Sequence, residues 1–169
     1  MTGQRQREIT EWADAAFGGP WTSNARGVAR MLEEVAELVT AVTTGAPPER
    51  VAGECADVMI CAFRLAAVEG FDLEAGLAAH TQLPLGATGL TEEILYFTAW
   101  VFEQVVLKNS FYTPLVFVAS RLRDLCRAVG RDLLAEVDAK MEINRRREWV
   151  PDGTGCGRHV KTTTGTVTS

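Results

Sequence analysis

The chain has 169 residues, of which 47% are hydrophobic, and it carries a formal net charge of −5. This length suits a single domain with a substantial core, and the acidic balance argues against a nucleic-acid-binding surface. No apolar run reaches the length of a membrane span, and the first residues lack the apolar stretch of a secretory signal. The four cysteines form no Cys-x-x-Cys pair, so we expect a reduced, cytoplasmic protein without nucleic-acid or membrane partners.

Helical signals follow one another along the chain, separated by helix-stop glycines and capping residues. The longer expected helices span residues 5–17, 22–44, 48–69, 91–106, 114–129 and 132–149. A short helix is expected directly after residue 72, with Asp72 as its N-cap. Residues 84–89 have the composition of a loop. A strand over residues 111–118 is a weak alternative, because Pro114 interrupts it. The sequence therefore predicts an all-α fold, a helical bundle.

Two short acidic runs lie in the second and third of these helices, with sixteen residues between them. Residues three or four apart share a helix face, so the acids of each run point in one direction. The acids are Glu33, Glu34 and Glu37 in the first run and Glu54 and Asp57 in the second. The gap contains Gly45-Ala46-Pro47-Pro48, a helix stop followed by a helix start.

The two runs lie at similar distances from this turn. Glu37 precedes Gly45 by eight residues and Glu54 follows Pro48 by six, which at ~1.5 Å per residue is roughly 12 and 9 Å. An antiparallel hairpin therefore brings the acids to one height. Carboxylates about 4 Å apart repel by roughly 4 kcal/mol at an effective dielectric constant near 20, so they need protons or a cation. An all-oxygen set suits Mg²⁺ or Mn²⁺.

A less specific interpretation of the first run is a solvated face, because its acids lie opposite the apolar stripe of their helix. The next helix argues for a site, since residues 55–68 are apolar on every side except at Asp57 and Arg64. A helix of this kind is buried, and buried charges are paired or bind metal. For Arg64, an ion pair with an acid and a contact with a phosphate are both open.

The last predicted helix ends in a basic segment. Lys140, Asn144 and Arg147 share a face, with Arg145 beside them. Arginine and lysine there could hold a triphosphate, or they could simply be solvated cations that favour a helix C-terminus. Residues 151–161 are rich in Gly and Thr and carry basic side chains, which fits either a flexible segment that closes over phosphates or a disordered tail.

These motifs resemble those of the MazG-like all-α nucleoside triphosphate pyrophosphohydrolases. The acidic part is Glu33-Glu34-x-x-Glu37 followed by Glu54-x-x-Asp57. The C-terminal part resembles the phage dATP/dGTP pyrophosphohydrolases of the MazZ type, in Lys140-Met141-x-x-Asn144-Arg145-x-Arg147-x-Trp149 and Asp152-Gly153-Thr154-Gly155. The resemblance covers about residues 30–161, and is loose between residues 80 and 114. We expect one domain over residues 1–161 and a flexible tail over residues 162–169.

The resemblance implies Mg²⁺-dependent cleavage between the α and β phosphates of a purine deoxynucleoside triphosphate, dGTP or dATP, in phage nucleotide metabolism. It implies that Glu34, Glu37, Glu54 and Asp57 hold Mg²⁺ or Mn²⁺, and that Glu33 adds a ligand or orients the water. It implies that the phosphates or sugar contact Lys140, Asn144, Arg145 and Arg147, with Lys140 also acting in catalysis. Such enzymes usually assemble as dimers or tetramers, so a homo-oligomer is expected.

Two other classes of function remain open from the sequence. The first is a related all-α pyrophosphohydrolase that acts on dUTP or phosphoribosyl-ATP, since the base pocket cannot be located from these residues. The second is a non-catalytic helical oligomer that binds nucleotides, although the complete set of five acids argues against a vestigial site.

Overall fold

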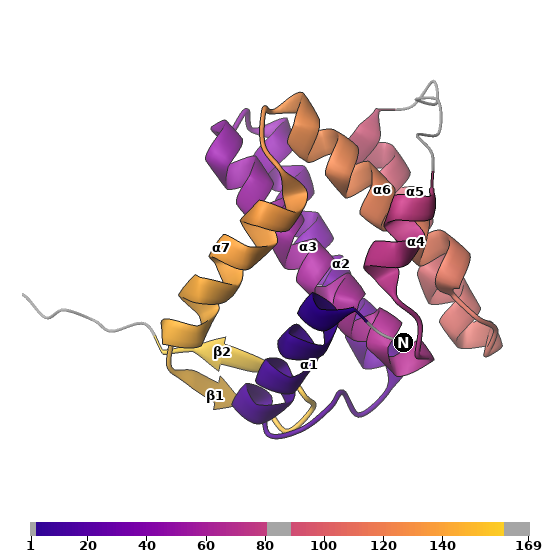
Figure 1. The fold of residues 1–169 in the computed structure, drawn as a ribbon, viewed down its shortest axis with the longest axis vertical. Helices are drawn as coiled ribbons and strands as arrows, with labels where there is room; N and C mark the ends of the chain where they lie inside the picture. The colour runs from indigo at the N-terminus through magenta and orange to yellow at the C-terminus, as the bar shows by residue number, and fades with distance from the viewer. Residues whose placement is uncertain (1–2, 81–88, 161–169) are drawn as a thin grey trace, which may run out of the picture.

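A computed structural model describes residues 3–80 and 89–160 of the chain. This part folds into seven helices and one antiparallel pair of short strands (Figure 1), which confirms the predicted all-α class. The elements are α1 (Gln4–Phe17), α2 (Asn24–Thr43), α3 (Pro48–Glu69), α4 (Leu73–Ala79), α5 (Leu90–Leu107), α6 (Tyr112–Ala128), α7 (Leu133–Arg146), β1 (Trp149–Pro151) and β2 (Gly157–His159).

The α2–α3 hairpin forms as the sequence predicts. Ser23 caps α2, because its hydroxyl accepts a hydrogen bond from the backbone N–H of Arg26 at 3.1 Å. Gly45 then turns the chain in the left-handed region, at a φ of 64°, and Pro48 occupies the first position of α3. These local signals fix the lengths of the two helices, and therefore which of their residues face one another.

Helix α3 lies at the centre of the molecule. It packs against α1, α2, α6 and α7, which explains why its sequence is apolar on every side. Every residue from 58 to 66 is buried, Arg64 included. In Figure 1, α7 crosses α3 on one side, whereas the α5–α6 pair covers the other side of the α2–α3 hairpin.

The α5–α6 pair departs from the sequence prediction at its ends. Helix α5 begins one residue earlier than predicted, with Gly89 as its N-cap. The hydroxyl of Thr91, the first residue of the predicted helix, donates to Glu92. Helix α6 begins at Tyr112, so the weak strand alternative over residues 111–118 is wrong. Pro114 is tolerated there because the first turn of a helix needs no backbone donor at that position. The predicted loop over residues 84–89 lies outside the described residues, apart from Gly89.

Helix α7 ends three residues earlier than predicted. Asp132 caps its start, but Arg147 is already extended, and Trp149 belongs to β1. The indole N–H of Trp149 donates to the backbone oxygen of Asn144 at 2.9 Å, which satisfies one of the free carbonyls at the helix end. Strand pairing then places Trp149 opposite His159.

The two strands and their turn form a hairpin, residues 149–159, that packs beside α1 (Figure 1). The indole N–H of Trp21 donates to Cys156 Sγ at 3.2 Å, and Arg64 donates to the backbone oxygen of Gly155 at 3.2 Å. Gly155 has a φ of 78°, and a Cβ there would lie 2.4 Å from the oxygen of Pro20, so only glycine fits. Residues 151–160 of the segment predicted to be flexible thus form this hairpin and the residue after it, and the predicted tail over residues 162–169 lies outside the described residues.

None of the described helices combines the length and the apolar character needed to cross a membrane.

Candidate active site with an acidic centre and a basic rim

The acidic residues of α2 and α3 meet in one place. Glu34, Glu54 and Asp57 each offer a carboxylate oxygen, and these oxygens all lie within 4.8 Å of one another. Glu34 is buried, with 6% of its surface exposed, whereas Glu37 and Glu33 are exposed. Both exposed acids still line the same cavity. The alternative interpretation of the first acidic run, as a solvated helix face, therefore fits Glu33 and Glu37 but not Glu34.

Lys140 on α7 reaches this carboxylate group from the opposite wall. Its Nζ lies 2.5 Å from Asp57 Oδ2, and both side chains are largely buried, at 22% and 16% exposure. The acidic hairpin thus faces the basic end of α7, because α7 packs along α3 and presents Lys140 one helix width away. Lys140 supplies one positive charge where three carboxylates converge.

Burial controls the protonation of these acids. It raises the pKa of Glu34 from 4.5 to about 7, with Arg30 opposing the shift and Asp57 and Glu37 adding to it. The pKa values of Asp57 and Glu54 are also raised, again mainly by burial, with Lys140 opposing both shifts. Burial therefore disfavours the ionised form of all three acids in the metal-free site, although Arg30, Arg50 and Lys140 pair with them. A bound cation would favour the ionised forms.

This shift predicts a pH-dependent stability for the metal-free protein. The folded state holds the Glu34 proton more tightly than the unfolded chain, so stability should fall as pH rises from about 4.5 to about 7. The difference between these two pKa values corresponds to at most about 3–4 kcal/mol. Glu34→Gln removes the titrating group, so its free energy of unfolding should fall less over this range.

Denaturant unfolding in the presence of EDTA, at pH values on both sides of this window, checks the prediction. Glu11→Gln, on an exposed position of α1, is the matched control and should follow the wild type. The free energy of unfolding of Glu34→Gln should still fall somewhat with pH, because Glu54 and Asp57 also have raised pKa values. If the free energy of unfolding changed with pH in the same way in all three proteins, the prediction would be contradicted.

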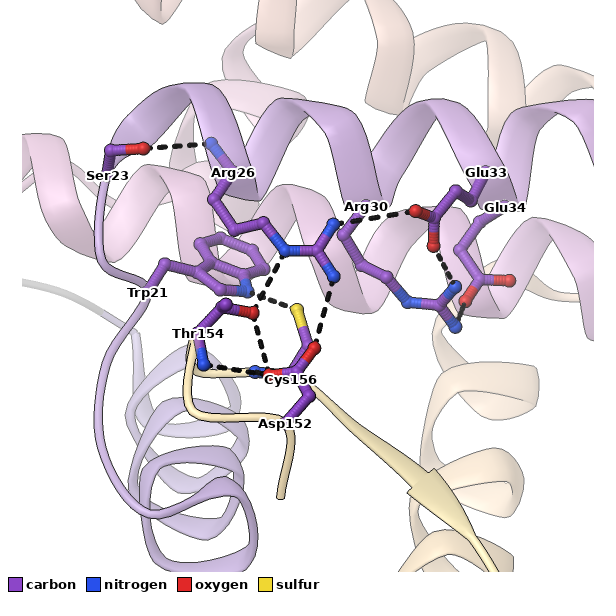
Figure 2. A network of polar contacts seen from close by, with 9 residues as sticks. All are labelled: Trp21, Ser23, Arg26, Arg30, Glu33, Glu34, Asp152, Thr154 and Cys156. Carbon is purple, nitrogen blue, oxygen red and sulfur yellow. Dashed lines mark hydrogen bonds and ion pairs between the residues drawn. The ribbon is translucent and has the colours of Figure 1, made fainter. Parts of the chain in front are cut away.

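Two arginines of α2 connect the acidic centre to the C-terminal hairpin (Figure 2). Arg30 donates to Glu33 at 2.6 Å and pairs with Glu34 one turn further along the helix. Arg26 also lies within 3.5 Å of Glu33, and it donates to Thr154 Oγ1 at 3.0 Å. One continuous row of charges therefore runs from the hairpin to the carboxylates.

The hairpin turn that meets Arg26 is built around Asp152. Its Oδ1 accepts hydrogen bonds from the hydroxyl of Thr154 at 2.7 Å and from the backbone N–H of Thr154 at 2.8 Å. These bonds lower the pKa of Asp152 to about 2, so the carboxylate stays charged opposite Arg26 at 3.3 Å. The Asp-Gly-Thr-Gly segment is thus a structured turn that fixes the hairpin against α2 (Figure 2).

A cavity of about 830 Å³ joins these groups. Its walls carry three kinds of side chain: the acids, a set of basic groups and a set of aromatic rings. The basic and amide groups are Arg26, Arg30, Arg64, Lys140, Asn144, Arg147 and Arg158, and the rings are Trp12, Phe17, Trp21, Trp149 and His159. Ligand cavities of this size hold molecules as large as nucleotides.

The structure brings most of the predicted basic residues to this cavity. Asn144 is buried in the wall, and Arg147 donates to Asn144 Oδ1 at 3.4 Å. Arg145 is the exception, because it points away, pairs with Glu142 at 3.0 Å and lines a second cavity beside α1. A helix turns about 100° per residue, so Arg145 could not share the face of Lys140 and Asn144.

Arg64 lines the cavity, but its guanidinium is already engaged. It pairs with Asp14 at 3.1 Å and stacks over the ring of Trp21, 4.1 Å from the ring centroid. With 5% of its surface exposed, it has little freedom to move toward a ligand. The sequence leaves two interpretations of Arg64 open, an ion pair and a phosphate contact. The contacts of Arg64 are those of an ion pair, and they do not support a role in phosphate binding.

Arg26 and Arg30 are not among the residues that the sequence predicts for the site. A signal for Arg30 was present, because it precedes Glu34 by four residues and Glu33 by three on a predicted helix. Arg26 offered no comparable signal, since its partners Asp152 and Thr154 lie more than a hundred residues away.

Comparison of the chain with protein-family models, with curated proteins and with solved structures found no match.

Proposed function

We propose that this protein is a Mg²⁺-dependent nucleoside triphosphate pyrophosphohydrolase, which converts a nucleoside triphosphate and water into a nucleoside monophosphate and pyrophosphate. The observation that carries the proposal is the convergence of Glu34, Glu54 and Asp57 opposite Lys140, in a cavity with a basic rim. The motif resemblance to MazG-like enzymes adds the reaction type and the preference for dGTP or dATP.

The donor set of the site fits a hard divalent cation. Three carboxylates supply only oxygen ligands, which suits Mg²⁺ or Mn²⁺ better than softer metals. Glu34, Glu54 and Asp57 would hold the ion, and Glu37, which lines the same cavity, would add a further ligand. When bound, Mg²⁺ supplies Lewis-acid chemistry, which activates water and neutralises charge on phosphate oxygens.

Other residues of the cavity would bind the phosphates and orient the water. Lys140 and Arg147 would contact phosphate oxygens, Lys140 as a point charge and Arg147 through its planar guanidinium. Asn144 holds Arg147 in place through its side-chain oxygen. Glu33 is exposed at the cavity and pairs with both Arg26 and Arg30, and it would add a ligand or orient the attacking water. Arg145 is not part of this proposal, because it faces the second cavity.

A water nucleophile suits the side chains that line the cavity. Burial raises the pKa of Cys61 far above its usual value, and the Sγ of Cys156 accepts the hydrogen bond of Trp21. A buried thiol with a raised pKa is a poor nucleophile. Direct attack of water on a phosphate is therefore favoured over a covalent enzyme intermediate.

A panel of nucleotides tests the proposal. Wild-type protein with Mg²⁺ is incubated separately with dGTP, dATP, dUTP and phosphoribosyl-ATP, and the products are separated by chromatography. We expect monophosphate and pyrophosphate, with faster turnover of the purine deoxynucleotides. Faster turnover of dUTP or phosphoribosyl-ATP would support the related pyrophosphohydrolases instead, and binding without turnover would support a non-catalytic nucleotide-binding protein.

The position of the label from ¹⁸O-water gives a sharper prediction. If water attacks the α phosphorus, the label should appear in the monophosphate and be absent from pyrophosphate. The expectation follows from a site made of carboxylates and cations around a triphosphate-sized cavity, with no activated side-chain nucleophile among the described residues. Mass spectrometry of both products measures it. Label in pyrophosphate, or release of orthophosphate, would rule out this mechanism.

A homo-oligomer, a dimer or a tetramer, belongs to the same proposal. Helix α5 supports it, because Leu95, Phe102 and Val106 share one face and are 41%, 45% and 60% exposed. Tyr96 and Leu107 add further exposed apolar surface on this helix. Large apolar patches on a surface commonly mark contacts between proteins.

A further inference from the structure

One end of the cavity is aromatic. Trp149 packs edge-to-face against Trp12 and Phe17, with ring centroids 6.0 and 5.2 Å apart, and lies 6.0 Å from the ring of His159. These four rings come from α1, β1 and β2, which lie side by side in Figure 1. All four residues line the cavity. We call them the aromatic subsite.

The rings of the aromatic subsite differ from those of the core. Phe63 and Phe111 in the core are 0% and 1% exposed, whereas all four rings of the subsite keep part of their surface accessible. The one polar donor of the Trp149 ring is already used by the backbone oxygen of Asn144. Trp149 is therefore held in orientation by this bond and by its ring contacts, and part of the residue remains exposed in the cavity.

Trp21 lines the same cavity but cannot serve in this way. One face of its ring is covered by Arg64, at 4.1 Å, and its indole N–H is engaged with Cys156. Only 9% of its surface is exposed. The accessible rings are consequently confined to the end of the cavity formed by α1 and the strands.

The lining residues of α7 and β1 follow one another in sequence from the carboxylates toward the strands. Lys140 pairs with Asp57, Asn144 follows one turn along α7, and Arg147 and Trp149 come in the extended segment after the helix. The helical part from residue 140 to 146 spans about 9 Å, and three extended residues add more. A nucleotide has the same order, from metal-bound phosphates through the sugar to the base.

We propose that the aromatic subsite binds the nucleobase of the substrate by stacking against the ring of Trp149. This inference rests on the proposed function for the presence of a nucleotide, and it locates the part of the cavity that distinguishes a nucleotide from other polyphosphates. Stacking on an aromatic side chain stabilises any nucleobase, because every base presents a π face.

The test measures binding of the two products, deoxyguanosine monophosphate and pyrophosphate, by calorimetry in the presence of Mg²⁺. The proposed reaction can cleave neither ligand, and only the first carries a base. Trp149→Leu should weaken binding of the monophosphate about 10-fold, which corresponds to 1.4 kcal/mol, and should leave binding of pyrophosphate within about twofold. Trp149→Phe should restore most of the affinity, since a phenyl ring can also stack.

Trp100→Leu is the matched control, because Trp100 is a half-buried tryptophan on α5 that packs against Phe117, away from the cavity. It should bind both ligands as the wild type does. His159→Ala is a second variant, which keeps the test decisive if Trp149→Leu melts early, and it should weaken only the monophosphate. Equal losses for both ligands, or no loss for either in both subsite variants, would overturn the subsite.

The outcome is separable from that of the proposed function. If the protein binds the monophosphate through Trp149 but hydrolyses no triphosphate, the subsite stands and the pyrophosphohydrolase proposal falls. If it hydrolyses triphosphates but Trp149→Leu and His159→Ala bind the monophosphate as the wild type does, the subsite falls alone.

Discussion

Asp57→Asn should lose more than about 100-fold in Mg²⁺-dependent turnover, because loss of even an indirect metal contact commonly costs 10- to 100-fold. Its stability should not fall. The pKa of Asp57 is raised, mainly by burial, so its ionised form is less favourable in the folded protein than in the unfolded chain. A neutral amide of the same shape avoids that cost. Initial rates with Mg²⁺ and thermal melting in EDTA measure the two effects.

Asp138→Asn is the matched control for this prediction. Asp138 lies in the second cavity, where its hydrogen bond with Arg5 at 2.7 Å lowers its pKa. The same substitution should therefore leave turnover unchanged and reduce stability slightly, which is the opposite pattern. Full activity of Asp57→Asn in chelator-treated buffer would refute a metal role for the acidic centre.

The acidic centre could be predicted because all of its determinants are local. Gly45 and Pro48 fix where α2 ends and α3 begins, and helical geometry then fixes the heights of Glu34, Glu54 and Asp57. The sequence could not rank these acids by burial. Glu34 is buried and Glu37 exposed although both belong to one motif and line one cavity, because burial depends on how α2 packs against its neighbours and not on helical spacing alone.

The C-terminal hairpin could not be predicted, because contacts distant in sequence stabilise it. Its strands have three residues each, and its Gly- and Thr-rich turn has the composition of a disordered segment. Order comes from Trp21, Arg26 and Arg64, which all lie more than 90 residues earlier. The early end of α7 has the same origin, since pairing with β2 competes with the helix for residues after Arg146.

The position of Arg145 shows a different kind of error. Its place in the basic set follows from the motif resemblance, whereas helical spacing alone places it about 100° from Asn144 and about 140° from Lys140. The structure agrees with the spacing, because Arg145 pairs with Glu142 and lies within 4.0 Å of Glu8 on α1. Where a motif and a periodicity disagree, the periodicity gives the direction of a side chain.

Lys140→Ala should reduce kcat about 100- to 1,000-fold, as removal of one group that stabilises transition-state charge does in other enzymes. We expect the effect in kcat and not in KM, because a leaving pyrophosphate gains charge as the bond breaks. Arg147→Ala should instead raise KM, since Arg147 is exposed at the cavity rim and would hold the triphosphate before and during the reaction. Steady-state kinetics of both variants distinguish these expectations.

The two substitutions should also differ in their effect on stability, which melting curves measure, because Lys140 and Arg147 differ in their surroundings. Lys140 pairs with the largely buried Asp57, so Lys140→Ala leaves three carboxylates without their ammonium group and should cost about 1–2 kcal/mol in metal-free buffer. Arg147→Ala should stay within about 0.5 kcal/mol of the wild type. Mg²⁺ should restore the stability of Lys140→Ala, because the cation replaces the missing positive charge among the carboxylates. If kcat is unchanged and Mg²⁺ restores nothing, Lys140 is structural, and Arg30 becomes the nearest alternative cation.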